Sequence, residues 1–277
     1  MSFLEDYGTD FALLHRLSSG NTGIMHIHPH WEMLLIATPE KARITVNGHF
    51  CDVDSPFLAL FSPFCLHKTD FIDIDKQIER FVCYFGEEMT SKYEQVFDEY
   101  SQLLSKKFWL FRLTEEETFK CKEMIAQTSK YPHNSIPQKL IFLLILSTIF
   151  DGRKLDNAAL NVDNFKICAI IKYMYEHIFE NINADSVASH FHISRSKLDK
   201  DFQKHTSVSF RQLLIDMRLS HAAYLILNST LKISEIAAMS GFENETYFYN
   251  QFKSFTGTTP LKYRKNPPKR DRRKVIQ

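Results

Sequence analysis

The sequence predicts an α+β protein with a strand-rich N-terminal half and an all-helical C-terminal half. Polar and apolar residues alternate around an Asn-Gly pair at residues 42–53, which predicts a β-hairpin. In the C-terminal half, a short helix, a tight turn and a longer helix are predicted twice, at residues 184–205 and 234–256. A length of 277 residues favours two domains over one.

The two halves differ in charge. Residues 1–162 contain 16 Lys and Arg against 22 Asp and Glu, a net charge of −6, whereas residues 163–277 contain 18 against 11, a net charge of +7. A basic half beside an acidic half indicates a polyanionic partner, such as nucleic acid, for the C-terminal half only. Taken alone, the asymmetry is equally compatible with chance.

The five cysteines are far apart, and none belongs to a C-x-x-C pair. This spacing predicts reduced, mostly buried thiols and a cytoplasmic location. The first six residues lack the basic segment and the apolar run of a signal peptide. The longest apolar run, at 140–146, is too short to span a bilayer, so we expect no membrane partner.

The N-terminal part, residues 1–86, contains short predicted strands separated by turn residues. Residues 57–61 form a continuous apolar run between Pro56 and Pro63, as in a buried strand, and residues 78–85 form another. Short strands at regular spacing predict a sandwich or a small barrel.

One group of polar residues in this part has the chemistry of a binding site. In a strand, the side chains of His26, His28, His30 and Glu32 share one face, and His67 follows further along. The pattern His-x-His-x-x-x-Glu with a later His resembles the first two motifs of the cupin barrel. The resemblance implies that the ligand positions of metal-binding cupins correspond to His26, His28, Glu32 and His67 of this chain. Imidazoles with one carboxylate suit a divalent transition metal.

The cupin resemblance is incomplete. The flanking glycines are missing, residues 54–56 replace the usual Pro-Gly-Asp turn, and Pro29 removes one backbone donor. We therefore assign His26, His28, His30, Glu32 and His67 to a pocket for a small-molecule effector. We predict no metal, no cofactor and no catalytic residue. Histidines that simply face solvent are the alternative.

Residues 87–150 are predicted to form a helical dimerisation segment. A capping box at Thr114 and Glu117 opens a helix that extends to about Lys130. The next helix has Pro137 in its first turn and is apolar nearly all round, so it must be buried. We expect a dimer contact there, with an intrachain core helix as the alternative. The polar residues 151–162 are the predicted linker.

The C-terminal domain is predicted to span residues 163–277. An amphipathic helix at 165–179 precedes the first repeat, whose short helix takes its N-cap from Asn183 or Asp185. A long helix at 210–228 is expected to join the two repeats rigidly.

Single residues predict where the helices of the repeats begin and end. Ser194 is the predicted N-cap of the longer helix of the first repeat, and Ser234 that of the short helix of the second. Gly241 supplies the second turn, because glycine tolerates a positive φ. Gly257 ends the last long helix.

With these residues the chain resembles the AraC/XylS family of bacterial transcription regulators. The matching residues are Ile233, Ile236, Ala237, Gly241, Phe242, Tyr247, Phe248, Phe252, Lys253, Gly257, Thr258, Thr259, Pro260, Tyr263 and Arg264, with Ser194, Ser196, Leu198, Phe202, Arg218, Leu219 and Ala222 in the first half. The resemblance covers about 100 residues, 165–265. Ser207 departs from it, because the family has a glycine there. A serine in a left-handed cap costs about 1 kcal/mol relative to glycine, so we expect a looser or differently capped helix end.

The resemblance implies that the two helix-turn-helix units dock in successive major-groove segments on one face of DNA, roughly 34 Å apart. It implies base contacts from Ser196, Asp199 and Lys200 on the first recognition helix, with the DNA-binding residue Arg195 adjacent to them, and from Thr246 and Asn250 on the second. Lys197, Lys204, Lys253 and Arg264 are expected to contact phosphates or to face solvent.

These observations together predict a homodimeric transcription regulator, an activator by analogy with the family. It would bind promoter DNA and a small-molecule effector, and RNA polymerase is a further candidate partner. The alternative is a metal-dependent cupin enzyme fused to a DNA-targeting module, which requires a metal with an open coordination position. A methyl-accepting repair protein would need a reactive cysteine cluster, and a redox sensor at Cys65 or Cys83 would need a neighbouring resolving cysteine.

Overall fold

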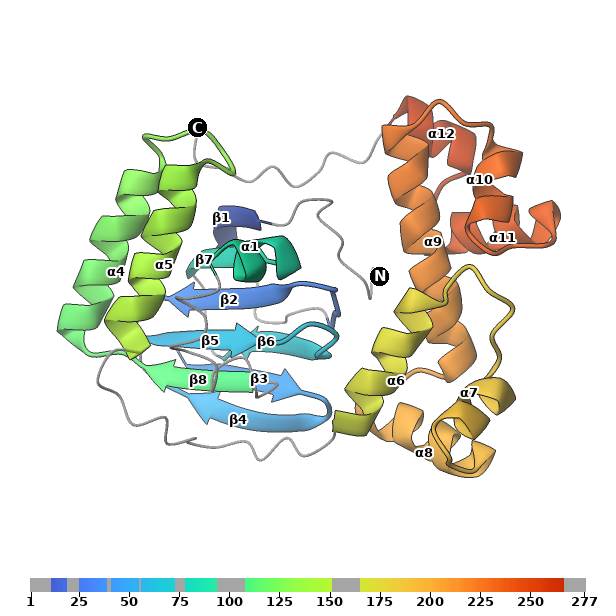
Figure 1. Ribbon diagram of the computed structural model, residues 1–277, viewed down its shortest axis with the longest axis horizontal. Coiled ribbons are helices and arrows are strands. Elements are labelled where there is room, and N and C mark those ends of the chain that lie inside the picture. Colours follow the sequence, from blue (N-terminus) through green and yellow to red (C-terminus); the bar gives the residue numbers. More distant parts are fainter. Residues whose placement is uncertain are drawn as a thin grey trace. The chain divides into compact units, whose positions relative to one another are not determined.

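The chain folds into two compact units, one formed mainly by residues 28–163 and the other by residues 164–271 (Figure 1). The computed structural model describes residues 11–18, 25–38, 41–54, 56–72, 78–93, 108–150 and 165–266. The predicted linker at 151–162 lies outside the described residues. Within the described part, no helix has the length and the apolar character needed to span a membrane. The protein is of the predicted α+β class.

The N-terminal unit is built from two antiparallel sheets. The five-stranded sheet has the order β1 (Phe11–Ser18), β7 (Ile78–Phe85), β2 (Trp31–Ile36), β5 (Phe57–Phe61) and β8 (Phe108–Arg112). The three-stranded sheet has the order β4 (His49–Val53), β3 (Ala42–Val46) and β6 (His67–Phe71). The predicted hairpin is confirmed, because Asn47 and Gly48 join β3 to β4 with φ values of 47° and 83°. Two positive φ angles are what a tight hairpin turn requires.

The five-stranded sheet is buried on both faces, which explains the continuous apolar run of β5. Alternate residues of a strand face opposite sides of the sheet. Leu58 and Leu60 belong to the core beneath the helices, whereas Phe57 and Phe61 belong to the core between the two sheets. All five residues of β5 are buried.

Two long helices cover the outer face of this sheet and lie side by side in Figure 1. They are α4 (Glu115–Thr128) and α5 (Ile136–Phe150), and the short α1 (Glu87–Lys92) precedes them. The predicted capping box of α4 is present: Glu117 N donates to Thr114 Oγ1 at 3.2 Å, and Thr114 N donates to Glu117 Oε2 at 2.8 Å. Helix α5 is not buried all round. It packs Phe142 and Ile149 into the core.

Two strand predictions differ from the structure. The segment from His26 to Glu32 is not one strand, because β2 begins only at Trp31 and Pro29 lies in a bend before it. A proline cannot donate to a sheet ladder. Residues 87–150, expected to be helical, also contain β8, which pairs with β5. Its apolar sequence is too short for periodicity to distinguish a strand from a helix.

The C-terminal unit is all-helical, and α9 (Phe210–Asn228) is its central element. Helices α6 (Phe165–Glu176), α7 (Ala184–His190) and α8 (Arg195–Thr206) precede α9, whereas α10 (Ile233–Met239), α11 (Glu245–Thr256) and α12 (Pro260–Lys265) follow it. Helix α9 contacts α8 as well as α10, α11 and α12 (Figure 1). The long helix therefore joins the two repeats, as predicted.

Most of the predicted caps of this unit are present, and one is wrong. Asn183 caps α7, and Ser194 Oγ accepts from Lys197 N at 3.2 Å. The predicted N-cap Ser234 lies inside α10, which begins at Ile233. Ile233 is buried in the core, and Lys232 N donates to Glu235 Oε2 at 2.7 Å. A Glu reaching back to the N-cap backbone replaces the hydroxyl cap that we expected.

The end of α8 has the left-handed residue that the repeat predicts, although it is not a glycine. Ser207 has a φ of 60°, close to the 76° of Gly257 at the end of α11. In both repeats a threonine hydroxyl, that of Thr206 or Thr256, donates to the carbonyl four residues earlier at 2.8 Å. The two helix ends therefore share the threonine hydrogen bond, and at the end of α11 Gly257 N also donates to Lys253 O at 2.9 Å.

Candidate functional site

The two helix-turn-helix units share one backbone geometry. In the first, Ile193 N donates to Ala188 O at 2.9 Å, and in the second, Phe242 N donates to Ala237 O at 3.0 Å. The residue before each donor has a positive φ, 52° at His192 and 76° at Gly241. Equivalent turns therefore lead into α8 and α11, the two candidate recognition helices.

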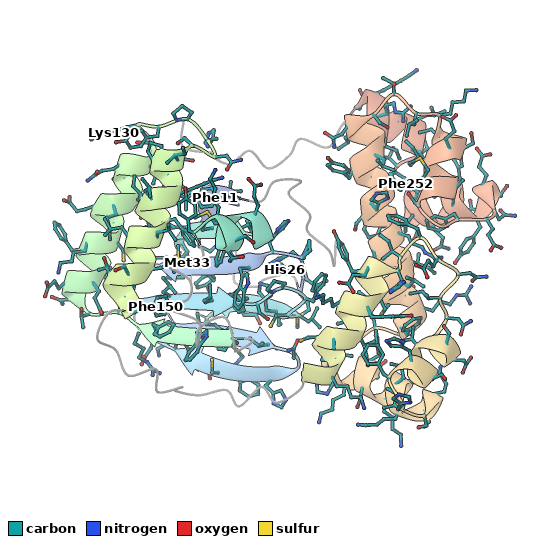
Figure 2. All side chains as sticks on the ribbon, in the orientation of Figure 1. Phe11, His26, Met33, Lys130, Phe150 and Phe252 are labelled. Atoms are coloured by element: carbon teal, nitrogen blue, oxygen red, sulfur yellow. The ribbon has the colours of Figure 1, made fainter. Side chains whose placement is uncertain are left out.

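Each candidate recognition helix is held by one apolar face. Leu198 and Phe202 of α8 are fully buried, as are Phe248 and Phe252 of α11, of which Figure 2 labels Phe252. The opposite face of each helix remains exposed. The exposed residues include the predicted DNA contacts Arg195, Ser196, Lys197, Asp199, Lys200 and Lys204 on α8, and Thr246, Asn250 and Lys253 on α11.

Charged side chains on α8 are paired with one another. Arg195 Nε donates to Asp199 Oδ2 at 3.0 Å, and its NH1 donates to Asp185 Oδ2 at 3.2 Å. Lys197 Nζ donates to Asp201 Oδ1 at 2.6 Å. Such exposed pairs contribute only about 0–1 kcal/mol each, so DNA phosphates or bases can displace them. Sequence reasoning missed Asp185, whose partner lies ten residues away.

Arg264 was expected to contact phosphate or to face solvent, but its guanidinium donates hydrogen bonds to two backbone carbonyls of the same unit. Its Nε donates to Ile226 O at 3.1 Å and its NH2 to Leu231 O at 2.8 Å. Arg218 makes the equivalent contacts in the first repeat, to Ile178 O and Glu180 O, both at 2.7 Å. Burial lowers the pKa of Arg218, and nearby Glu243 partly opposes this shift.

The turn of the second unit packs against the first half through Arg218. A Cβ atom added at Gly241 would lie 2.9 Å from Arg218 Nε and 3.0 Å from Ile178 O. Next to it, the ring of His221 on α9 lies 3.3 Å from Ser240 Oγ and contacts Phe179 edge-on. The Arg218 hydrogen bonds join residues 40 and 38 positions apart in sequence, which no local pattern predicts.

The N-terminal unit brings together most of the predicted pocket residues. Glu32 is the second residue of β2, His67 is the first of β6, and His28 precedes β2. Glu32 Oε2 lies 2.9 Å from His28 Nε2 and 3.2 Å from His67 Nε2. All three side chains are buried, with 4% exposure for Glu32, 0% for His28 and 1% for His67.

Rings and backbone hydrogen bonds hold these side chains in place. The ring of Phe61 stacks on His67 at 3.9 Å between centroids, and Tyr84 meets His28 edge-on at 5.1 Å. Phe64 N donates to His28 O at 2.9 Å, which ties the loop before His67 to His28.

His26 and His30 differ in their relation to this group. A ligand atom of His26 lies within 4.8 Å of those of His28, Glu32 and His67. We call these four residues the His–Glu cluster. His30 contributes its backbone carbonyl, which accepts from His28 Nδ1 at 2.8 Å. The cluster forms because a loop and two strands converge, and not because one strand presents one face.

Comparison with known proteins identifies the C-terminal unit. A family model described as a helix-turn-helix domain matches residues 187–266. The Msm operon regulatory protein of Streptococcus mutans is 25% identical over 232 residues, which cover 81% of each chain. The transcriptional activator RhaR of Cronobacter sakazakii is 41% identical over 76 residues, which cover 27% of each chain. Residues 187–266 therefore resemble a helix-turn-helix domain, and both of these relatives are regulatory proteins.

Other relatives match a smaller share of the chain. The xylose operon regulatory protein of Escherichia coli is 35% identical over 92 residues, but the match spans only 24% of that protein. Among solved structures, ToxT from Vibrio cholerae has a TM-score of 0.53 at 17% identity, with 92% of this chain and 98% of ToxT covered. At this identity the likeness shows the fold alone. It covers 92% of this chain. The relatives are regulatory proteins, which favours a regulator over the alternative of a cupin enzyme.

Proposed function

We propose that the protein is a cytoplasmic, homodimeric transcription regulator whose N-terminal unit binds a small-molecule effector and thereby changes promoter binding by the C-terminal unit. The observation that carries this proposal is the pair of recognition helices, each with a buried aromatic or aliphatic face and an exposed polar face. Contacts to phosphates would position the protein, and contacts to base edges would give sequence specificity.

The individual DNA contacts divide into two groups. Asn250 and Lys200 are exposed and have the functional groups that pair with adenine and guanine in the major groove. Arg195 and Asp199 would reach bases after their mutual ion pair opens. Arg264 supports the fold through two carbonyls, so Lys253 and Lys204 are better phosphate contacts.

The effector site is proposed at the His–Glu cluster, where buried polar groups converge beside the apolar core between the two sheets. Ligand sites typically combine an apolar lining with a few such polar groups. One solved ToxT structure contains a bound organic acid, which supports a ligand site in this fold. We propose no catalysis by this unit. The protein would activate transcription, with RNA polymerase as a partner.

The dimer contact is proposed on the exposed side of α5. Ile136, Leu140 and Leu144 lie at intervals of four residues and are 58%, 51% and 55% exposed. On a helix this spacing makes one continuous stripe. An apolar stripe of this kind is typical of an interface between protein chains.

Genome-wide footprinting with the purified protein, with and without candidate metabolites, tests the regulator. We expect protection of a limited set of promoters, a change when the effector is added, and a steep loss of binding as salt increases. Equal affinity for all DNA sequences, or an affinity that does not change with salt concentration, would contradict the proposal.

A further inference from the structure

Arg218 on α9 contacts both halves of the C-terminal unit at once. Its Nε donates to Ile178 O and its NH2 to Glu180 O, both at 2.7 Å, in the segment that leads from α6 into the first helix-turn-helix unit. The turn of the second unit packs against the same guanidinium. A Cβ atom added at Gly241 would lie 2.9 Å from Arg218 Nε and 3.0 Å from Ile178 O, so only a glycine allows this close approach.

A second residue of α9 makes the same connection. The ring of His221 meets the ring of Phe179 edge-on at 4.7 Å between centroids. Its Nδ1 lies 3.3 Å from Oγ of Ser240, which is fully buried beside the second turn. Residues three positions apart on a helix are neighbours on its surface, as Arg218 and His221 are. We call these two residues the α9 bridge, because both connect the same two segments.

The apolar core of the second unit does not reach the first unit. Its described members come from α9 and from the segment after α9, and none comes from α6, α7 or α8. The first unit meets α9 near the start of that helix, where the rings of Phe202 and Phe210 lie edge-on at 5.5 Å. Arg218 attaches the first unit again about two helical turns further along α9. Two attachment points restrict rotation of one unit relative to the other.

The separation and angle of the two recognition helices decide which DNA can engage both of them. Helix-turn-helix units bind half-sites about one helical turn, roughly 34–36 Å, apart. Inserting one base pair moves the second half-site by about 3.4 Å and rotates it by roughly 34° around the DNA axis. A rigid pair of units then loses one set of contacts, because both sets cannot form simultaneously. A loosely connected pair retains more of them.

We propose that the α9 bridge, with Arg218 as its main positioning residue, sets the half-site spacing that the protein accepts in DNA. The inference rests on the proposed function, because it requires both units to bind DNA. Arginine suits this role, since its planar guanidinium donates to two carbonyls at fixed angles, whereas the ammonium of lysine is a point charge on a flexible stem. Arg218→Lys therefore keeps the charge and removes the fixed geometry.

Selection from a random duplex library tests this role. The full-length protein is incubated with DNA duplexes of random sequence, and the bound duplexes are sequenced to find the half-sites and their spacing. The selected site is then titrated beside a version with one base pair inserted between the half-sites. We expect the insertion to weaken wild-type binding about tenfold or more, and Arg218→Lys binding about threefold or less.

Arg264→Lys is the matched control. Arg264 also donates to two backbone carbonyls, those of Ile226 and Leu231, but both belong to α9 and the second repeat. The ratio of affinities for the two spacings should therefore equal the wild-type ratio. A purely structural role of Arg218 would lower the affinity for both spacings equally, whereas a role in spacing changes their ratio.

Three results would overturn the role of the α9 bridge. The first is a wild-type protein that tolerates the insertion, and the second is an Arg218→Lys variant with normal far-UV circular dichroism and the wild-type ratio. The third is an Arg264→Lys variant that tolerates the insertion as well as Arg218→Lys does. If Arg218→Lys does not fold, His221→Ala replaces it with the same expected and contrary results, because it removes the other half of the bridge.

The selection also separates this inference from the function on which it rests. If the folded wild-type protein enriches no sequence, the proposed regulator is contradicted. If it enriches a single half-site, or paired half-sites whose spacing preference the variants retain, DNA binding stands and only the role of the α9 bridge is overturned.

Discussion

Gly241 lies where the second helix-turn-helix unit contacts the first. Its replacement by alanine should strongly lower the stability of the C-terminal unit. The residue has a φ of +76°, and an added Cβ would lie 2.9 Å from Arg218 Nε and 3.0 Å from the carbonyl oxygen of Ile178. Both atoms already take part in one hydrogen bond, at 2.7 Å. The new methyl group therefore cannot be accommodated without moving the guanidinium or the backbone.

Two separable costs make up the expected effect. A non-glycine residue in a left-handed conformation costs roughly 1–2 kcal/mol. Displacing Arg218 would break at least one charge-assisted hydrogen bond, which costs about 1.5–3 kcal/mol. Gly241→Ala should thus lower the free energy of unfolding by about 3–5 kcal/mol.

Gly257→Ala is a control that isolates the second cost. Gly257 has the same φ of +76°, but no heavy atom lies within 4 Å of its ideal Cβ. Only the conformational cost of roughly 1–2 kcal/mol should appear. A double variant with Arg218→Lys should lose less than the sum of the single variants, because the two residues are in contact.

The chain offers separate probes for its two units. Both tryptophans, Trp31 and Trp109, lie in strands of the N-terminal unit, so tryptophan fluorescence follows that unit alone. Far-UV circular dichroism follows the helices of both units, and most of the described helical residues belong to the C-terminal unit. In urea, Gly241→Ala should shift the helical transition and leave the fluorescence transition unchanged. Equal destabilisation by Gly241→Ala and Gly257→Ala would refute the role of the Arg218 contact.

Three further predictions concern the dimer, the DNA and the thiols. Leu140→Glu should convert a dimer into a monomer in sedimentation velocity. Leu261→Glu, at a site with the same 51% exposure, should leave the dimer intact. A Leu140→Glu variant that remains dimeric would exclude the apolar stripe on α5 as the dimer contact. Asn250→Ala should weaken a cognate site by about 1–3 kcal/mol and spare random DNA, and equal losses on both would reject a base contact. Burial raises the pKa of Cys51 and of Cys121 from 9.0 to about 11, so each thiolate forms only at higher pH than usual. Alkylation of the native protein at pH 8 should therefore be about a hundredfold slower than after unfolding, and rapid labelling would contradict this burial.

The elements with a strong local pattern were predicted from the sequence. The hairpin around Asn47, the capping box at Thr114 and the long helix α9 appear where the periodicity and the turn residues place them. Each of these elements is determined by residues that are close to one another in sequence, so local patterns are enough to predict it. The start of α10 was misplaced because burial of Ile233, a tertiary effect, outweighs the cap preference of Ser234.

The candidate sites were only partly predictable, because their decisive contacts are long-range. The His–Glu cluster was expected on one strand, yet it forms from a loop and two strands, and Glu32 and His67 are 35 residues apart. The Arg218 contact with Ile178 spans 40 residues. Composition indicates which side chains are available, whereas the sheet register and the path of α9 decide which of them meet.

The two helix-turn-helix units adopt the same left-handed backbone conformations with different residues, and this makes their stabilities unequal. The turn and the final cap of each unit require a positive φ, which the second unit provides with Gly241 and Gly257 and the first with His192 and Ser207. Each non-glycine residue costs the first unit about 1 kcal/mol relative to glycine. The first unit must also open the Arg195–Asp199 pair before these side chains reach DNA. The second unit meets the same requirements with glycines and without these costs, so its turn and its final cap should be the more stable of the two.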